Sequence, residues 1–196
     1  MSSISPDALA QLFTEGRTFH DWLPKPVEDS TLRAVYDLMK MGPTSANSCP
    51  ARIVFVQTPA GKEKLLPCVV PQNADAVKRA PGTAIIAMDD KFYDLMPKLI
   101  PPAPFYRDLF ASNKELAEST KFRNSSLQGA YFILAARALG LDCGPMSGFD
   151  NKKMDDTFFA GTAWKSNFIC NIGYGDRTKL RPRLPRLAFE EACKIV

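Results

Sequence analysis

Histidine is almost absent from this chain of 196 residues, because His20 is the only one. That count excludes metal sites built on two histidines, such as the H-E-x-x-H pattern of zinc proteases. Any Ser-His-Asp or Cys-His mechanism would have to depend on His20. The chain also lacks the G-x-x-x-x-G-K-[ST] loop of P-loop nucleotidases. If the protein is an enzyme, we therefore expect a bound cofactor to supply its difficult chemistry.

Cysteines are few and scattered, and long hydrophobic runs are missing. No two of the five cysteines are close in sequence, which argues against a disulfide framework and against a thiolate zinc site. We therefore expect no metal site and a cytoplasmic location, where thiols stay reduced. The longest apolar run, residues 130–136, is far shorter than the roughly 20 residues that a membrane-spanning helix needs. No membrane partner is predicted.

The charge balance is close to even. Lys and Arg number 25 and Asp and Glu number 21, which gives a net charge of +4. That is well below the bias expected of a dedicated nucleic-acid-binding protein. Hydrophobic residues make up 45% and charged residues 23% of the chain, which is the composition of an ordinary globular protein. We therefore expect a single domain over residues 1–196, with no nucleic-acid partner.

Helical and strand patterns alternate irregularly along the chain. The clearest helix is predicted from about residue 115 to 139, where apolar residues recur at three- and four-residue steps before Gly140. Its segment 130–136 is expected to be buried on most sides. The pattern as a whole predicts an α+β fold with a small central sheet flanked by helices. Other helices are predicted from Pro6 to before Gly16, at 29–41 and at 150–159, and strands at 52–57, 83–88 and 167–172.

A basic segment near the C-terminus is the first candidate for chemistry. Residues 177–186 carry five cations and no acid, and Pro182 and Pro185 force the segment to be extended. Residues two apart in an extended chain project to the same side, so Arg181 and Arg183 could hold one phosphate between them. The run could instead be a solvated surface. It could also contact nucleic acid, although it lacks the aromatic residues of a stacking platform.

Three further segments gather polar groups. Residues 16–22 offer a cation, a hydroxyl and an imidazole within four positions, a set that suits a phosphate monoester. Residues 43–50, between two prolines, present short polar side chains that could read the edge of a heterocycle, although such residues also favour turns. Residues 144–148 are expected to form a turn whose two glycines let the backbone approach a flat ligand. Each of the three could also be an ordinary loop.

In this order and at these spacings, the four segments resemble the flavin-dependent nitroreductase family over nearly the whole chain. The family has basic-basic-Ser-x-basic near its N-terminus, where this chain has G-R-T-F-H at residues 16–20, without the first basic residue. The family pattern P-S-x-x-N-x-Q-P-W corresponds to P-T-S-A-N-S-C-P-A at residues 43–51, which departs at the Gln and Trp places. The string R-P-R-L-P at residues 181–185 matches the family's basic-x-Arg-Leu-Pro.

The resemblance implies that FMN is the cofactor and that NADH or NADPH is the hydride donor. It also implies an intertwined α+β homodimer with two flavins at the subunit interface. The catalytic contact it implies is the backbone N–H of Ser147, directed at flavin N5, the atom that takes the hydride. The residues expected to bind the cofactor are Arg17, Thr18, His20, Ser45, Asn47, Asn73, Pro145, Met146, Ser147, Arg181 and Arg183.

Shorter strings resemble one branch of the family more closely. G-P-T-S-A-N, F-R-N-S-S, G-P-M-S-G-F-D and N-I-G-Y-G-D are similar to the malonic semialdehyde reductases of bacterial pyrimidine catabolism. That likeness implies ping-pong reduction of 3-oxopropanoate to 3-hydroxypropanoate, and Arg107 and Arg123 are candidates for binding the substrate carboxylate. The alternatives are a broad-specificity nitroreductase or quinone reductase, a flavin-binding protein without turnover, and a non-catalytic anion-binding module.

Overall fold

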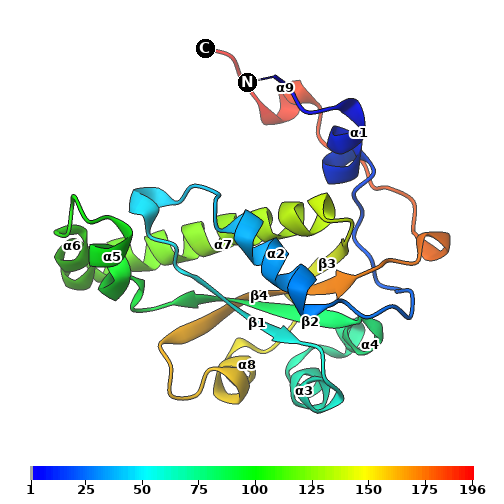
Figure 1. The fold of residues 1–196 in the computed structure, drawn as a ribbon, viewed down its shortest axis with the longest axis horizontal. Coiled ribbons are helices and arrows are strands. Elements are labelled where there is room, and N and C mark those ends of the chain that lie inside the picture. The colour runs from blue at the N-terminus through cyan, green and yellow to red at the C-terminus, as the bar shows by residue number, and fades with distance from the viewer. Residues whose placement is uncertain (1) are drawn as a thin grey trace.

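The computed structural model describes residues 2–196, and its centre is a four-stranded antiparallel sheet (Figure 1). The α+β fold with a small sheet that the sequence predicts is confirmed. The strands lie in the order β1-β2-β4-β3, so β2 and β4 are central while β1 and β3 form the two edges. The bounds are Ala51–Val56 for β1, Gly82–Asp89 for β2, Asp142–Met146 for β3 and Trp164–Gly173 for β4.

The segment 144–148 was expected to be a turn, and this prediction is wrong for most of its length. Its first three residues belong to β3, which pairs with β4 in the register Gly144↔Asn171 and Met146↔Ile169. An edge strand tolerates Pro145, because the nitrogen of a proline has no hydrogen to donate to a neighbouring strand. Only Ser147 and Gly148 lie beyond the strand.

Helices cover both faces of the sheet (Figure 1). The helices α2 and α7 pack on one face, and α3, α4 and α8 on the other. The helices predicted near residues 29 and 115 are confirmed to within two residues at each end. The bounds are Asp29–Met39 for α2, Pro59–Leu65 for α3, Pro71–Arg79 for α4, Lys114–Ala138 for α7 and Asn151–Phe158 for α8.

Four further short helices complete the fold. The side chain of Ser5 accepts a hydrogen bond from the Ala8 N–H at 3.2 Å, which fixes the predicted start of the first helix. The first and last of the four stand away from the sheet and bury no residue (Figure 1). The bounds are Pro6–Leu9 for α1, Met96–Leu99 for α5, Tyr106–Ser112 for α6 and Phe189–Ala192 for α9.

The long helix α7 is unusual in which side chains it buries. The segment 130–136 is buried only in part, since Phe132, Ala135 and Ala136 are inside while Ala130 is exposed. Within residues 2–196, no helix combines the length and the apolar character needed to cross a membrane. The residues of α7 that face the rest of the chain include the polar side chains of Thr120, Lys121, Asn124, Ser125 and Gln128, whereas Leu116, Phe122 and Leu127 are exposed.

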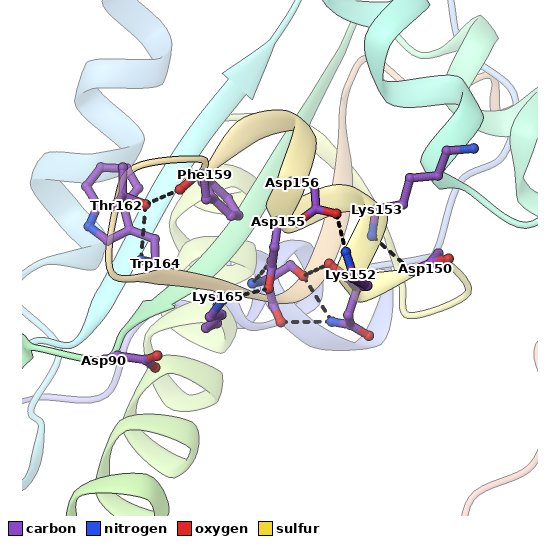
Figure 2. A network of polar contacts seen from close by, with 12 residues as sticks. Asp90, Asp150, Lys152, Lys153, Asp155, Asp156, Phe159, Thr162, Trp164 and Lys165 are labelled. Carbon is purple, nitrogen blue, oxygen red and sulfur yellow. Dashed lines mark hydrogen bonds and ion pairs between the residues drawn. The ribbon is translucent and has the colours of Figure 1, made fainter.

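A polar network fixes α8 against β4 (Figure 2). The Asp155 carboxylate accepts a hydrogen bond from the Ser166 N–H at 2.7 Å and lies 3.7 Å from the Lys165 ammonium. At the start of the helix, Asp150 accepts a hydrogen bond from the Lys153 N–H at 3.0 Å. These carboxylates already bind neighbouring backbone N–H groups and a cation, so they are not candidates for a ligand site.

Candidate functional site

The two ends of the chain meet at one cavity of about 620 Å³. The guanidinium of Arg17 donates a hydrogen bond to the Arg181 carbonyl. In the opposite direction, Arg183 donates to the carbonyls of Thr14 at 2.5 Å and Gly16 at 3.0 Å. The sequence-predicted residues that line this cavity are Arg17, Thr18, His20, Arg181 and Arg183.

The N-terminal wall of this cavity is held in place by β3. The Phe19 N–H donates to the Cys143 carbonyl at 3.0 Å, and Thr18 forms a parallel bridge with Cys143. The backbone approaches so closely that a Cβ built on Gly144 would lie 2.4 Å from the Phe19 carbonyl oxygen. A little further on, Trp22 forms an antiparallel bridge with Gly175 after β4. Residues 17–22 are therefore attached to the sheet by backbone contacts.

Several cations that line the cavity have no carboxylate partner among residues 2–196. Among residues 2–196, none of the guanidinium groups of Arg17, Arg181, Arg183 and Arg186 forms an ion pair with a carboxylate. The two carboxylates that line the cavity pair with other cations, since Asp21 lies 3.3 Å from Arg79, and Asp176 lies 3.9 Å from Lys179, which also lines the cavity. The cavity is therefore strongly positive.

The acidic residue Asp176 stays charged at the edge of this cavity. Its carboxylate accepts hydrogen bonds from the Thr178 hydroxyl at 2.6 Å and from the Thr178 N–H at 3.0 Å. These hydrogen bonds lower the pKa of Asp176, because they stabilise its ionised form. The carboxylate thus orders residues 176–179 and holds the start of the basic segment.

This donor set fits the phosphate end of a mononucleotide. Several guanidinium groups, a hydroxyl and an imidazole line one cavity, and arginine pairs with phosphate oxygens through two parallel hydrogen bonds. The volume of about 620 Å³ lies within the range of small-molecule sites. Within the described residues, no cluster of three or more His, Cys, Asp or Glu side chains could hold a metal ion.

A second group of predicted residues lies at the end of β3. Asn73 on α4 donates a hydrogen bond from Nδ2 to the Gly148 carbonyl at 3.2 Å, and the Val70 N–H donates to the same oxygen at 3.1 Å. The structure thus places Asn73 beside Gly148, two residues after Met146. These residues do not line the cavity that contains Arg17, Arg181 and Arg183, which we call the arginine cavity.

The loop with Ser45 and Asn47 does not line the arginine cavity. The Asn47 carboxamide donates to the Leu99 carbonyl at 2.7 Å, which places this loop beside α5 rather than beside the arginines. Its backbone is strained, since Ala46, Asn47 and Cys49 have φ values of 51°, 52° and 40°, which are uncommon for residues other than glycine. One chain does not bring Ser45 and Asn47 to the arginine cavity.

Two features of the site escape the sequence reasoning. Arg137, in the last turn of α7, lines the arginine cavity although it belongs to no predicted motif. Polar residues buried on α7 anchor the strained loop, because Asn124 accepts from the Ser45 N–H at 2.8 Å and Gln128 from the Ala51 N–H at 2.9 Å. Asn124 and Gln128 are four residues apart and therefore lie on the same face of the helix. Their spacing in a helix with many apolar residues is the sequence signal that could have revealed this anchor of the loop.

Comparison with known proteins gives a consistent result. Residues 17–174 match the family model described as the nitroreductase family. A protein described as a nitroreductase from Bacillus subtilis has a similar structure, with a TM-score of 0.85 at 19% identity, covering 98% of this chain and 100% of that one. Another from Exiguobacterium sibiricum, solved in complex with FMN, has a TM-score of 0.86 at 15% identity, covering 100% of both chains. One described as an NAD(P)H:FMN oxidoreductase from Staphylococcus epidermidis has 0.83 at 17% identity, covering 100% and 98%.

Proposed function

Because this chain belongs to the nitroreductase family, we propose that it is an FMN-dependent NAD(P)H oxidoreductase. The observation that carries the proposal is the convergence of Arg17 with Arg181 and Arg183 on one cavity, with no carboxylate paired to any of them among residues 2–196. The similar structures described with FMN and as an NAD(P)H:FMN oxidoreductase support it.

In this proposal the arginine cavity holds the FMN phosphate. Arg17, Arg181 and Arg183 neutralise the phosphate charge, and the Thr18 hydroxyl donates a further hydrogen bond. Contacts with backbone carbonyls hold the guanidinium groups of Arg17 and Arg183 in place before the ligand arrives, which lowers the cost of ordering them on binding. His20 lies along the phosphate or ribityl chain and is not a proton donor to the acceptor.

The residues at the end of β3 form the site for the flavin ring. Pro145 and Met146 pack on the ring face, and the Ser147 N–H donates a hydrogen bond toward N5. Asn73 supports this segment through Gly148 and lies near the polar edge of the ring. When bound, FMN supplies two-electron hydride transfer between the nicotinamide and the acceptor. The protein orients both substrates in turn at one place, which predicts ping-pong kinetics.

The same proposal includes a homodimer. α7 exposes Phe122, with 57% of its surface accessible, together with Leu116 and Leu127. Its buried side carries Phe132 and three alanines but also five polar residues. An isolated chain would normally turn the exposed apolar side chains inward. A second copy packed on α7 would remove them from water, and α1 and α9, which bury nothing in one chain, would wrap around that copy.

A dimer also accounts for the position of Ser45 and Asn47. They do not line the arginine cavity of their own chain, so we assign them to the flavin held mainly by the other copy. Each of the two sites then combines the arginine cavity of one protomer with the strained loop of its partner. This arrangement makes flavin binding depend on dimer formation.

The acceptor we propose is 3-oxopropanoate, which is reduced to 3-hydroxypropanoate. NAD(P)H gives up a hydride, the carbonyl carbon receives it, and one proton from solvent neutralises the alkoxide, so atoms and charge balance. Arg107 is engaged by Asp108 at 2.7 Å and Asp94 at 3.8 Å. Arg123 forms no ion pair within residues 2–196 and is the candidate that we favour for the substrate carboxylate.

The test is anaerobic reduction and reoxidation of the purified protein. We expect flavin absorption bands, loss of these bands on addition of NADH or NADPH, and their return on addition of 3-oxopropanoate. A protein that is colourless and stays so after incubation with FMN would contradict the whole proposal. Reoxidation by nitroaromatics or quinones that is faster by orders of magnitude would overturn the acceptor alone and favour a broad-specificity reductase.

A further inference from the structure

Gly16 stands at the place of the first basic residue in the N-terminal motif that this chain lacks, and another cation occupies the space above it. A Cβ built on Gly16 would lie 2.7 Å from Cζ and 2.7 Å from Nη1 of Arg137. A side chain at position 16 would therefore require the guanidinium of Arg137 to shift. Gly16 is not among the residues with positive φ, so the backbone conformation does not require a glycine, and the guanidinium of Arg137 lies where a side chain of residue 16 would be.

We propose that Arg137 replaces the missing basic residue and binds the phosphate of the cofactor. The inference rests on the proposed function, because it concerns the ligand of the same cavity. Arg137 reaches that cavity from the last turn of α7, about 120 positions after the N-terminal motif in the sequence. The charge is thus supplied from a different element of the fold.

The contacts of Arg137 leave it able to bind an anion. Its Nη1 donates to the Leu12 carbonyl at 2.8 Å, which fixes the direction of the guanidinium. No carboxylate forms an ion pair with Arg137 among residues 2–196, and it is only partly exposed. A guanidinium carries five N–H donors, so one contact with Leu12 leaves most of them for phosphate oxygens.

A purely structural role is the rival explanation. The contact with Leu12 satisfies a carbonyl in the π-helical turn Ala10–Thr14 that follows α1, and the Gln11 carboxamide donates to the Arg137 carbonyl at 2.6 Å. A residue with only this role would hold the N-terminal segment in place whatever ligand is present. A phosphate-binding residue, in contrast, would discriminate between a ligand with phosphate and the same ligand without it.

The experiment titrates the full-length protein, stripped of cofactor, with FMN and with riboflavin, and follows the quenching of flavin fluorescence. For Arg137→Met we expect the Kd for FMN to rise about tenfold or more, because a hydrogen bond to a charged group is lost. The Kd for riboflavin should change by less than about twofold. The control is Arg33→Met on α2, an exposed arginine outside this cavity, which should change neither constant.

A second variant keeps the test decisive if Arg137→Met folds poorly. In Gly16→Arg combined with Arg137→Ala, the space above position 16 is freed for the new arginine. We expect this double variant to bind FMN within about threefold of the wild type, whereas Arg137→Ala alone should bind FMN at least tenfold more weakly. If the contact with Leu12 were the only role of Arg137, an arginine at position 16 would not restore FMN binding.

The outcomes separate this inference from the proposed function. Equal weakening of FMN and riboflavin binding, or no weakening of either, would overturn the role of Arg137 while leaving an FMN protein. Wild-type protein that binds neither flavin would overturn the proposed function itself. A preference for FMN over riboflavin that is lost in Arg137→Met and regained in the double variant would establish the inference.

Discussion

The carboxamide oxygen of Asn124 lies 2.8 Å from the backbone nitrogen of Ser45 and accepts its hydrogen bond. The same helix holds the loop at two other points, since Gln128 accepts from the Ala51 N–H at 2.9 Å and the Tyr131 hydroxyl donates to the Pro43 carbonyl at 3.0 Å. These contacts explain how a loop with three non-glycine residues at positive φ stays ordered. α7 therefore supports the loop that we assign to the flavin of the partner.

Removing the acceptor at position 124 should destabilise the protein and loosen this loop. In Asn124→Ala the N–H of Ser45, an exposed residue, loses its partner, which costs about 0.5–1.5 kcal/mol of the free energy of unfolding. Urea unfolding measures the loss, and hydrogen exchange at the Ser45 amide should become faster. The exposed Ser119→Ala on the same helix should stay within about 0.5 kcal/mol of wild type. Unchanged exchange at Ser45 in Asn124→Ala would show that the loop is held by other contacts.

Local patterns were enough to predict most of the elements. The helix α7 was predicted because apolar residues recur along it and Gly140 ends it, and α2 because a helical pattern stops before a Gly-Pro pair. β3 was missed, because Gly144 and Pro145 are typical of turns. Its strand conformation comes from pairing with β4, a contact with residues some 25 positions away that local preference does not contain.

The candidate site, like the fold, was only partly predictable from the sequence. Arg17 and Arg181 are 164 positions apart, and only the resemblance to a family implied that they would meet. The departure at Gly16 was visible in the sequence, but the compensating Arg137 was not, because it requires knowing where the end of α7 lies. Ser45 and Asn47 could not be placed either, since one chain does not carry them to the cavity.

The close approach at Gly144 leads to a prediction for the site. In Gly144→Ala the new methyl group would be only 2.4 Å from the Phe19 carbonyl oxygen, so the segment with Arg17 and Thr18 must move. We expect a loss of about 1–3 kcal/mol in stability, and weaker binding of both FMN and riboflavin. Gly82→Ala in β2 is the matched control, because its nearest contact is 3.3 Å from the flexible Gln57 side chain. Normal flavin binding by Gly144→Ala would contradict the role of β3 in positioning this wall.

Asp142 should make the stability of the protein depend on pH. Burial raises the pKa of its carboxyl above the ordinary value of 3.8, although the Gly175 N–H, at 3.0 Å, and the nearby charges of Arg177 and Arg137 oppose the shift. The folded state then binds a proton more tightly than the unfolded state. The stabilisation from this carboxyl is complete below 3.8 and is lost as the pH rises through the raised pKa.

The variant Asp142→Asn isolates this effect, because its side-chain oxygen can still accept from the Gly175 N–H. Compared with this variant, the wild type should lose stability as the pH rises from about 4 to 7, as measured by urea unfolding at each pH. Asp75→Asn, at an exposed position of α4, should not show the same dependence. A wild type that gains stability relative to Asp142→Asn over this interval would reverse the sign and refute the argument.

The exposed apolar side of α7 leads to a prediction about assembly. Phe122 is a large side chain with 57% of its surface accessible, and it would be buried by the second copy that we propose. Replacing it with glutamate puts a charge into that contact in both protomers. We expect Phe122→Glu to raise the dissociation constant of the dimer by about 30-fold or more, measured by sedimentation over a range of concentrations. Flavin should be lost together with the dimer.

Lys152→Glu, at an exposed position of α8, should sediment as the wild type does. A wild-type chain that is monomeric yet binds FMN tightly would overturn both the dimer and the assignment of Ser45 and Asn47 to the site of the partner.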